Sequence, residues 1–248
     1  MSDRLRFDRL DAWRGLAMVW MAVFHFCFDL NLYGFLQPRQ LFLSDPFWTV
    51  QRTLIVSLFL SCAGVSLAVA LHQAQSWPRF WRRWMQVAVC AVLVSAGSAL
   101  MFPNSWITFG VLHGIAVMLV LARLLAIFLA RYLASAQWLL WPVGALFIAL
   151  PRLVQHRFFD SPWTDWLGLV TRLPVTEDWV PVLPWLGVMV WGVALGQWLL
   201  QHRPSLLTGA LPKGLRPLAL LGRWSLSFYM LHQPLLIGLV MAAATMRR

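Results

Sequence analysis

Long apolar stretches constrain the fold of this chain more than any other feature of its sequence. A helix needs about 20 apolar residues to cross the hydrocarbon core of a bilayer. The stretches lie at roughly residues 12–34, 47–71, 84–102, 106–129, 136–151, 182–201 and 217–244. Because 60% of the residues are hydrophobic and 12% are charged, the composition differs from that of a soluble domain. The pattern predicts an all-α, polytopic membrane helix bundle of about seven transmembrane helices, with eight possible, in a single domain over residues 1–248.

The basic residues predict the orientation of the chain. Its 20 Lys and Arg against 9 Asp and Glu give a net charge of +11. A basic chain can bind nucleic acid, but these arginines lie between apolar stretches, so we expect no nucleic-acid partner. Cytoplasmic loops of membrane proteins are rich in Lys and Arg, and a cytoplasmic N-terminus puts most of them on that side. Residues 152–181 then form an extracytoplasmic loop, and the expected location is a bacterial inner (plasma) membrane.

The cysteines predict neither a disulfide framework nor a zinc site. There are three, and each falls within an apolar stretch: Cys27, Cys62 and Cys90. An odd number of buried thiols without a C-x-x-C motif is typical of inert core residues. We therefore expect no metal.

The first apolar stretch carries three ionisable residues, which are costly inside a bilayer and indicate function. Arg14 and His25 lie on one face, about three turns and about 16 Å apart along the axis. His25 and Asp29 have i,i+4 spacing, which brings their side chains into contact range. A carboxylate beside an imidazole fixes its tautomer and raises its basicity. We predict that His25 and Asp29 are catalytic and that Arg14 binds a cofactor. Taken singly, they also fit an interfacial anchor, a core imidazole and a helix-end carboxylate.

Further candidates lie in later segments. His113 and His232 fall within apolar stretches and are predicted to line a polar cavity, although lone histidines in such stretches are often structural. Guanidinium groups bind phosphate, so we predict a phosphate site in the arginines of the inner side, which alternatively reflect topology alone. These are Arg79, Arg82, Arg83 and Arg223. Trp163 and Trp179, in the long loop, are predicted to stack on a sugar, with interfacial anchoring as the alternative.

Four segments resemble a known family when taken together and in order. They are residues 9–15, 109–116, 182–187 and 221–234, and the Arg14-x10-His25 spacing also resembles the first helix of acyltransferase-3 membrane enzymes. The set is similar to the bacterial proteins that resemble the heparan-α-glucosaminide N-acetyltransferase catalytic domain. The resemblance implies a multi-helix acyltransferase that takes an acyl group from acyl-CoA at the cytoplasmic face. It passes the group to an acceptor, often a sugar, at the other face.

Three functions are compatible with these residues. In the first, an acyltransferase, the arginines hold the phosphates of acetyl-CoA or another acyl-CoA, and His25 activates a hydroxyl or amine of a sugar or glycan. In the second, a membrane electron carrier, histidines ligate haem. In the third, a transporter subunit, the polar stripe lines a pathway, but no inverted repeat is evident. Small residues such as Gly64 and Gly192 allow close helix packing, either within the chain or in a homodimer.

Overall fold

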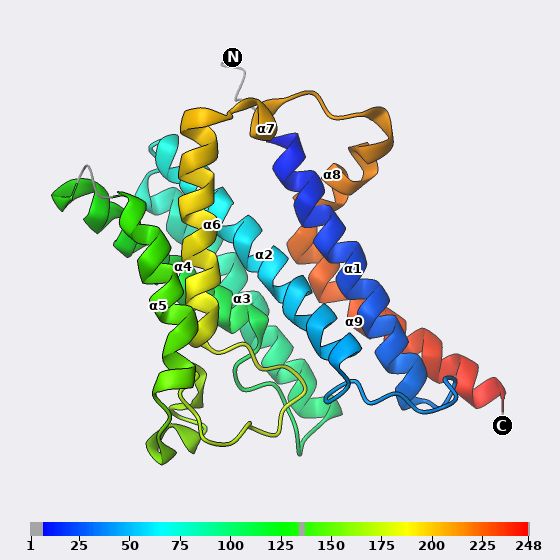
Figure 1. The fold of residues 1–248 in the computed structure, drawn as a ribbon. Helices are drawn as coiled ribbons and strands as arrows, with labels where there is room; N and C mark the ends of the chain where they lie inside the picture. Colours follow the sequence, from blue (N-terminus) through cyan, green and yellow to red (C-terminus); the bar gives the residue numbers. More distant parts are fainter. Residues whose placement is uncertain (1–6, 134–136, 248) are drawn as a thin grey trace. The chain divides into compact units, whose positions relative to one another are not determined.

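The computed structural model describes residues 7–133 and 137–247, and these residues form helices and connecting segments without β-strands. Figure 1 shows the arrangement. The α-helices are α1 (Asp8–Leu32), α2 (Pro46–His72), α3 (Trp77–Met101), α4 (Val111–Tyr132), α5 (Leu140–Leu153), α6 (Val182–His202), α7 (Ser205–Thr208), α8 (Arg216–Arg223) and α9 (Ser225–Met246). The 3-10 helices are Gln137–Leu139, Arg157–Asp160, Asp165–Leu167 and Lys213–Leu215. The predicted all-α membrane bundle is confirmed.

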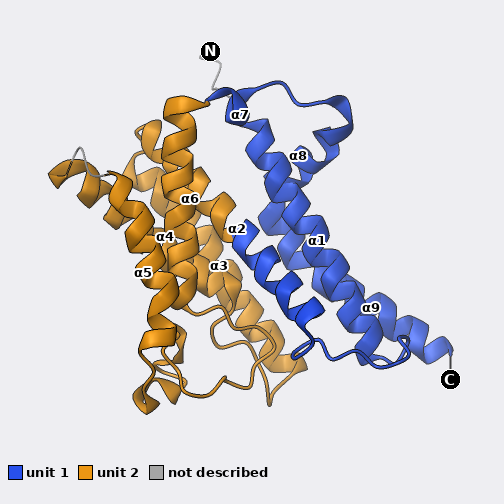
Figure 2. Ribbon diagram, viewed as in Figure 1, with its two compact units in different colours: residues 1–59, 204–248 blue, residues 60–203 orange. Residues whose placement is uncertain are grey.

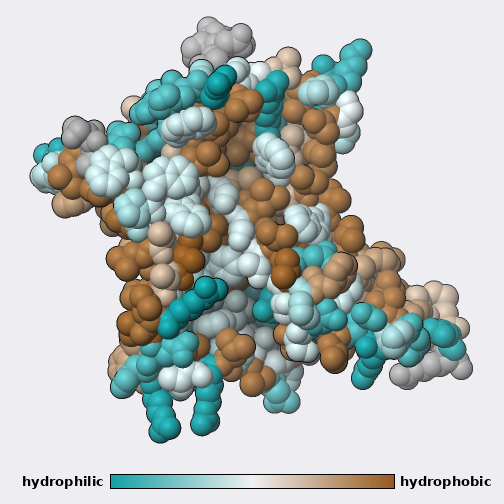
Figure 3. Space-filling model, viewed as in Figure 1, coloured by the Kyte–Doolittle hydropathy of each residue, from teal (hydrophilic) through white to brown (hydrophobic). Residues whose placement is uncertain are grey.

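Six of the described helices are long and apolar enough to cross a membrane: α1, α2, α3, α4, α6 and α9. Their outward surfaces are apolar as well, as on α3, where Val92 and Leu100 are 64% and 87% exposed. Figure 3 shows apolar residues along the middle of the helices and hydrophilic residues toward their ends. Apolar surface of this extent is stable only in an apolar surrounding. The chain is therefore a multi-pass membrane protein.

The shorter apolar helix, Gln137–Leu153, is the best candidate for a seventh crossing. It packs against α6 along most of its length: Gln137 meets Gln201 at one end, and Gly187 meets Gly144 and Ile148 toward the other. In addition, α1 and α9 run in the same direction (Figure 1). Six crossings would make the first and last helices antiparallel, whereas seven make them parallel. The direction of α9 thus favours the predicted number of seven.

Two helix boundaries differ from those expected. The third helix begins at Trp77 rather than near residue 84, with Pro78 in its first turn, where proline is well tolerated. The last stretch, expected as one helix over 217–244, is two helices that meet at Trp224. The break allows α8 to fold back on α1, so that Arg223 reaches Asp8.

The chain forms two compact units, coloured separately in Figure 2. Unit 1 comprises residues 1–59 and 204–248. Its core contains Met18, Met21 and Phe24 of α1 together with Phe42 and Ile55. Helices α1 and α8 approach at their backbones, because a Cβ at Gly15 would overlap the carbonyl of Leu218, and one at Gly222 would overlap that of Asp11. Only glycine permits this contact at either position.

Unit 2 comprises residues 60–203 and includes the end of α2 together with α3, α4, α5 and α6. Close backbone packing again depends on glycine: Gly64 of α2 lies against Met189 of α6, and Gly192 lies against Ser61. The small residues that could have served a homodimer are therefore occupied inside this unit.

Candidate active site

Ion pairs join the start of α1 to the end of α8 within unit 1. Asp11 Oδ1 and Arg14 Nη1 are 2.8 Å apart, and Arg223 Nη2 lies 2.8 Å from Asp8 Oδ1. Arg223 Nε is also 3.8 Å from Asp11 Oδ2. Arg14 donates a further hydrogen bond to the carbonyl oxygen of Gly222 (3.3 Å). The two predicted phosphate-binding arginines of this unit therefore meet two carboxylates, and the four charges balance. Sequence reasoning assigned no role to either carboxylate.

A pair of histidines lies further along α1 and on α9. His25 Nδ1 of α1 and His232 Nε2 of α9 are 2.9 Å apart, and the two rings are nearly parallel, with 14° between their planes. Phe24 and Phe228 flank the pair. We call His25 and His232 the histidine pair. His25 was predicted to be catalytic and His232 to line a cavity, and the structure brings them into direct contact.

Asp29 has a different partner from the one expected. Its side chain is 1% exposed, and both carboxylate oxygens accept hydrogen bonds from Gln233 Nε2, at 3.1 and 3.3 Å. Among the described residues, no hydrogen bond joins Asp29 to His25. The i,i+4 spacing permits that contact, but a partner on a neighbouring helix holds each side chain. Gln233, which follows His232 in the sequence, was missed because the chain gives no sign that α9 faces α1 at this height.

The arginines of unit 2 lie on the first turns of α3. Arg79, Arg82 and Arg83 have i, i+3 and i+4 spacing, so they share one face of the helix. All three are exposed, and within residues 7–133 and 137–247 none of them makes an ion pair. Trp84 anchors the opposite side of these turns by donating to the carbonyl of Ala116 (2.8 Å). The result is a local concentration of three uncompensated positive charges.

A buried arginine supports this segment. Arg123 of α4 is 2% exposed and donates to both the side chain and the backbone carbonyl of Gln75 (3.1 and 2.8 Å). Its guanidinium carbon lies 4.5 Å from the ring centroids of Trp77 and Phe80. Cation–π contacts of this kind stabilise a desolvated guanidinium. Arg123 therefore holds the turn from which the three exposed arginines project.

His113 is engaged in capping α4. Its Nδ1 accepts from the backbone N–H of Gly110 (3.3 Å), so its proton lies on Nε2, which faces Ser95 Oγ at 3.2 Å. Asp178, from the long loop, accepts the N–H of Val111 at the same helix end (2.7 Å). Both ring nitrogens thus satisfy local groups. The predicted cavity role of His113 stays a prediction.

The loop over 152–181 presents the two candidate tryptophans differently. Trp163 is 86% exposed, and Trp166 donates to its backbone carbonyl (2.9 Å). Trp179 is half-buried, and its Nε1 has no hydrogen-bond partner among the described residues. Trp163 therefore offers an open ring face, whereas Trp179 offers a buried donor.

The same loop contains a buried carboxyl whose titration should affect stability. Asp165 is 4% exposed, and its Oδ1 has no partner in the described part of the chain. Burial raises its pKa above the ordinary 3.8. The folded state then binds a proton more tightly than the unfolded state, so stability falls as the pH rises from the unfolded to the folded pKa. We expect Asp165→Asn to gain about 1 kcal/mol over the wild type near neutral pH, because the amide removes the cost of burying an ionised carboxylate.

Thermal unfolding in detergent at about pH 3 and about pH 8 measures this difference. It should be small at the lower pH, which lies below the ordinary Asp pKa of 3.8, because the wild-type carboxyl is then mostly protonated in both the folded and the unfolded state, and larger at the higher pH. A variant less stable than the wild type at both values would contradict the expectation.

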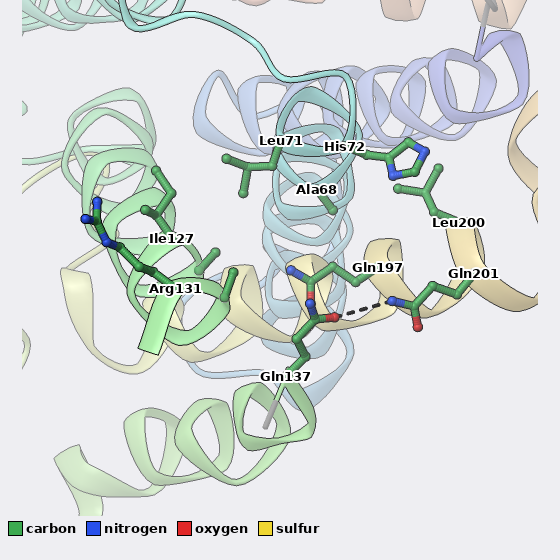
Figure 4. Close-up of a pocket in the computed structure, with 11 residues that line it drawn as sticks. Ala68, Leu71, His72, Ile127, Arg131, Gln137, Gln197, Leu200 and Gln201 are labelled. Carbon is green, nitrogen blue, oxygen red and sulfur yellow. Dashed lines mark hydrogen bonds between the residues drawn. The ribbon is translucent and has the colours of Figure 1, made fainter. Parts of the chain in front are cut away.

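A cavity of about 470 Å³ lies in unit 2, apart from the candidate residues (Figure 4). Its wall is part apolar and part amide: Ala68, Leu71, His72, Ala126, Ile127, Ala130, Arg131, Gln137, Gln197, Leu200 and Gln201. Gln201 donates to Gln137 across it (3.3 Å). No residue of the histidine pair or of the arginine clusters lines it.

The geometry does not favour histidine ligation of haem. Haem iron lies between its axial nitrogens, but the histidine pair is joined by a direct hydrogen bond. The nitrogens of His113 are also occupied locally. Within the described ranges, no three His, Cys, Asp or Glu side chains are placed to hold a metal ion.

Fold and site together define a multi-pass helical membrane protein with ionisable side chains paired inside its spans. A family model described as "Heparan-alpha-glucosaminide N-acetyltransferase, catalytic" matches residues 6–234. The chain belongs to this family, as its ordered motifs predicted. The family consists of membrane acetyltransferases, which in general use acetyl-CoA as donor. No curated protein and no solved structure matches the chain.

Proposed function

We propose that the protein transfers an acetyl or other acyl group from acyl-CoA at the cytoplasmic face to a sugar or glycan at the extracytoplasmic face. His25 serves as the general base. The observation that carries this proposal is the histidine pair, a basic group held inside a membrane-spanning helix and bonded to a second imidazole. The choice of an acetyl group, and of acetyl-CoA as its donor, is inferred from the family to which the chain belongs.

In the proposed reaction the acyl group passes directly from coenzyme A to the acceptor. His25 removes a proton from the hydroxyl or amine of the acceptor as its oxygen or nitrogen attacks the thioester carbonyl carbon. The carbon–sulfur bond then breaks, and the coenzyme A thiolate takes the proton from His25. A general base placed in this way typically accelerates such a step about 100-fold to 10,000-fold.

The arginines support a cytoplasmic donor site. In the proposed topology the N-terminus is cytoplasmic and α1 and α2 each cross the membrane once, so α3 begins at the cytoplasmic surface. Lys and Arg are enriched on the cytoplasmic side. Arg79, Arg82 and Arg83 have no carboxylate partner among the described residues and are the principal candidates for the coenzyme A phosphates. Arg14 and Arg223 contribute where a phosphate displaces Asp11 or Asp8.

The depth of His25 fits a long donor. It lies about 16 Å along α1 from Arg14. Coenzyme A, when extended, keeps its charged end at the surface while its thioester reaches this depth. The acceptor enters from the opposite side, where the exposed ring of Trp163 provides a stacking surface for a sugar. Trp179, His113 and Asp29 are proposed to complete the acceptor side, in a bacterial plasma membrane.

Removing the positive charges of α3 should weaken donor binding. We expect the triple variant Arg79→Gln/Arg82→Gln/Arg83→Gln to bind acetyl-CoA at least about tenfold more weakly, because charge-assisted hydrogen bonds to phosphate contribute about 1.5–3 kcal/mol each when formed. Thermal shift of the purified protein with acetyl-CoA and with free CoA measures the effect. Transfer is then measured by mass spectrometry on a panel of sugars and glycans.

The matched control removes the same charge from the long loop, as Arg152→Gln/Arg157→Gln/Arg172→Gln, and should leave donor binding unchanged. Equal loss in both variants would point to net charge rather than a phosphate site. Wild-type protein that shows neither a shift with acetyl-CoA nor any transfer would overturn the proposed function.

A further inference from the structure

The hydrogen bonds of His232 determine where its proton lies. Its Nδ1 is 2.7 Å from the backbone carbonyl oxygen of Tyr229. A carbonyl oxygen can only accept a hydrogen bond, so Nδ1 of His232 carries the hydrogen. A neutral imidazole has one N–H, which leaves Nε2 of His232 as an acceptor.

The position of the proton on His232 in turn determines the position of the proton on His25. Since Nε2 of His232 accepts, the facing Nδ1 of His25, 2.9 Å away, must donate. The proton of neutral His25 is therefore on Nδ1, and its Nε2 holds a free lone pair. No described residue hydrogen-bonds to that Nε2. It is also absent from the fully buried polar atoms that lack a partner, so part of its surface is accessible. It is the nitrogen that remains available to a substrate.

The surroundings favour the neutral form of both rings. Phe24 and Phe228 flank the histidine pair, and a charged imidazole is costly in apolar surroundings. The carboxylate of Asp29 is bonded to the amide of Gln233, and among the described residues no carboxylate hydrogen-bonds to either imidazole. The pair is thus oriented by a backbone carbonyl rather than by an acid.

We propose that His232 is the positioning residue of the acyl transfer, fixing the tautomer of His25 so that Nε2 is the reacting base. The inference rests on the function proposed above. When Nε2 of His25 takes the acceptor proton, the resulting cation keeps its Nδ1–H bonded to Nε2 of His232, and that bond becomes charge-assisted and stronger. The cation loses the proton to the thiolate, which restores the neutral pair. The role expected of Asp29 thereby belongs to His232.

Two substitutions at His232 distinguish a role in positioning His25 from a role in packing alone. His232→Leu removes the acceptor that faces His25, whereas His232→Gln can return an acceptor as its amide oxygen. We expect the leucine variant to lose at least about 100-fold in kcat, because an imidazole in the wrong tautomer is a poor base. The glutamine variant should recover at least about tenfold of that loss. KM for acetyl-CoA should stay within about twofold in both.

A spectroscopic measurement tests the tautomer without relying on activity. Nitrogen NMR of the full-length protein with ¹⁵N-labelled histidine distinguishes Nδ1–H, Nε2–H and doubly protonated rings. The signals are assigned by their loss in His25→Gln and His232→Gln. We expect Nδ1–H on both members of the histidine pair in the wild type, and loss of the single tautomer of His25 in His232→Leu.

The outcomes separate this inference from the proposed function. A proton on Nε2 of His25, a doubly protonated His232, or a folded His232→Leu variant with wild-type kcat would overturn the positioning role even if transfer occurs. Correct tautomers in a protein that transfers no acyl group would instead overturn the proposed function and leave the geometry standing. Thermal unfolding of each variant establishes that it is folded.

Discussion

His25→Ala is expected to abolish acyl transfer while acetyl-CoA still binds. The substitution removes the base that takes the acceptor proton, and general-base catalysis contributes about 100-fold to 10,000-fold. The proposed donor phosphates lie toward the cytoplasmic end, about 16 Å away along α1, so the affinity for acetyl-CoA should change little. Mass spectrometry of the acylated product measures transfer, and the thermal shift with acetyl-CoA measures binding.

The matched control is His202→Ala, which removes an exposed imidazole at the end of α6. That side chain stacks on Trp198 and lies outside unit 1. We expect its turnover to equal that of the wild type. If His25→Ala keeps wild-type turnover, His25 is not the base; if it loses binding and transfer together, the residue acts in folding or donor binding instead.

Gly222→Ala is expected to lower both stability and activity strongly. The added methyl group would overlap the backbone carbonyl of Asp11, and backbone atoms cannot move aside as a flexible side chain can. Overpacking typically costs about 1–3 kcal/mol, and displacing a helix costs at least that much. Separating α8 from α1 would also break the hydrogen bond from Arg14 to Gly222 and shift the start of α9, which carries His232. The melting temperature and the yield of monodisperse protein report the loss.

Gly238→Ala provides the control in the same unit. Gly238 lies within α9, and a Cβ there would have no atom of the described residues within 4 Å. Alanine is the better helix former by about 0.5–1 kcal/mol, so this variant should match or exceed the wild type in stability. Gly15→Ala should behave like Gly222→Ala, since its Cβ would overlap the carbonyl of Leu218. Equal stability of Gly222→Ala and Gly238→Ala would show that α1 and α8 are not in backbone contact.

The predicted helices and their class were accessible from the sequence because membrane insertion depends on local hydrophobicity. The boundaries of the helices were harder to predict from the sequence. The first turns of α3 contain Arg79, Arg82 and Arg83, and these charges hid a helix that Trp84 and Arg123 anchor from the other side. The break at Trp224 was hidden as well, because the apolar character continues from α8 into α9 while the chain turns back on α1.

The sequence pointed to the residues of the candidate site, but it did not indicate which of them contact each other. His25, Asp29 and His232 were all singled out, but spacing along α1 linked His25 to Asp29. In the structure, Asp29 bonds to Gln233 and His25 bonds to His232. Arg14 and Arg223 were predicted to bind a cofactor through its phosphates, and in the structure each meets a carboxylate of the first two turns of α1.

The sequence by itself determined that this chain is a multi-pass helical membrane protein, that it belongs to an acetyltransferase family, and which ionisable residues lie inside its spans. These properties follow from composition, hydropathy and motif order, which are local and additive along the chain. Only the tertiary structure decided which of those residues meet. Contacts between helices depend on rotation and register, and these are set by packing, as where Gly15 and Gly222 bring α1 and α8 together at their backbones.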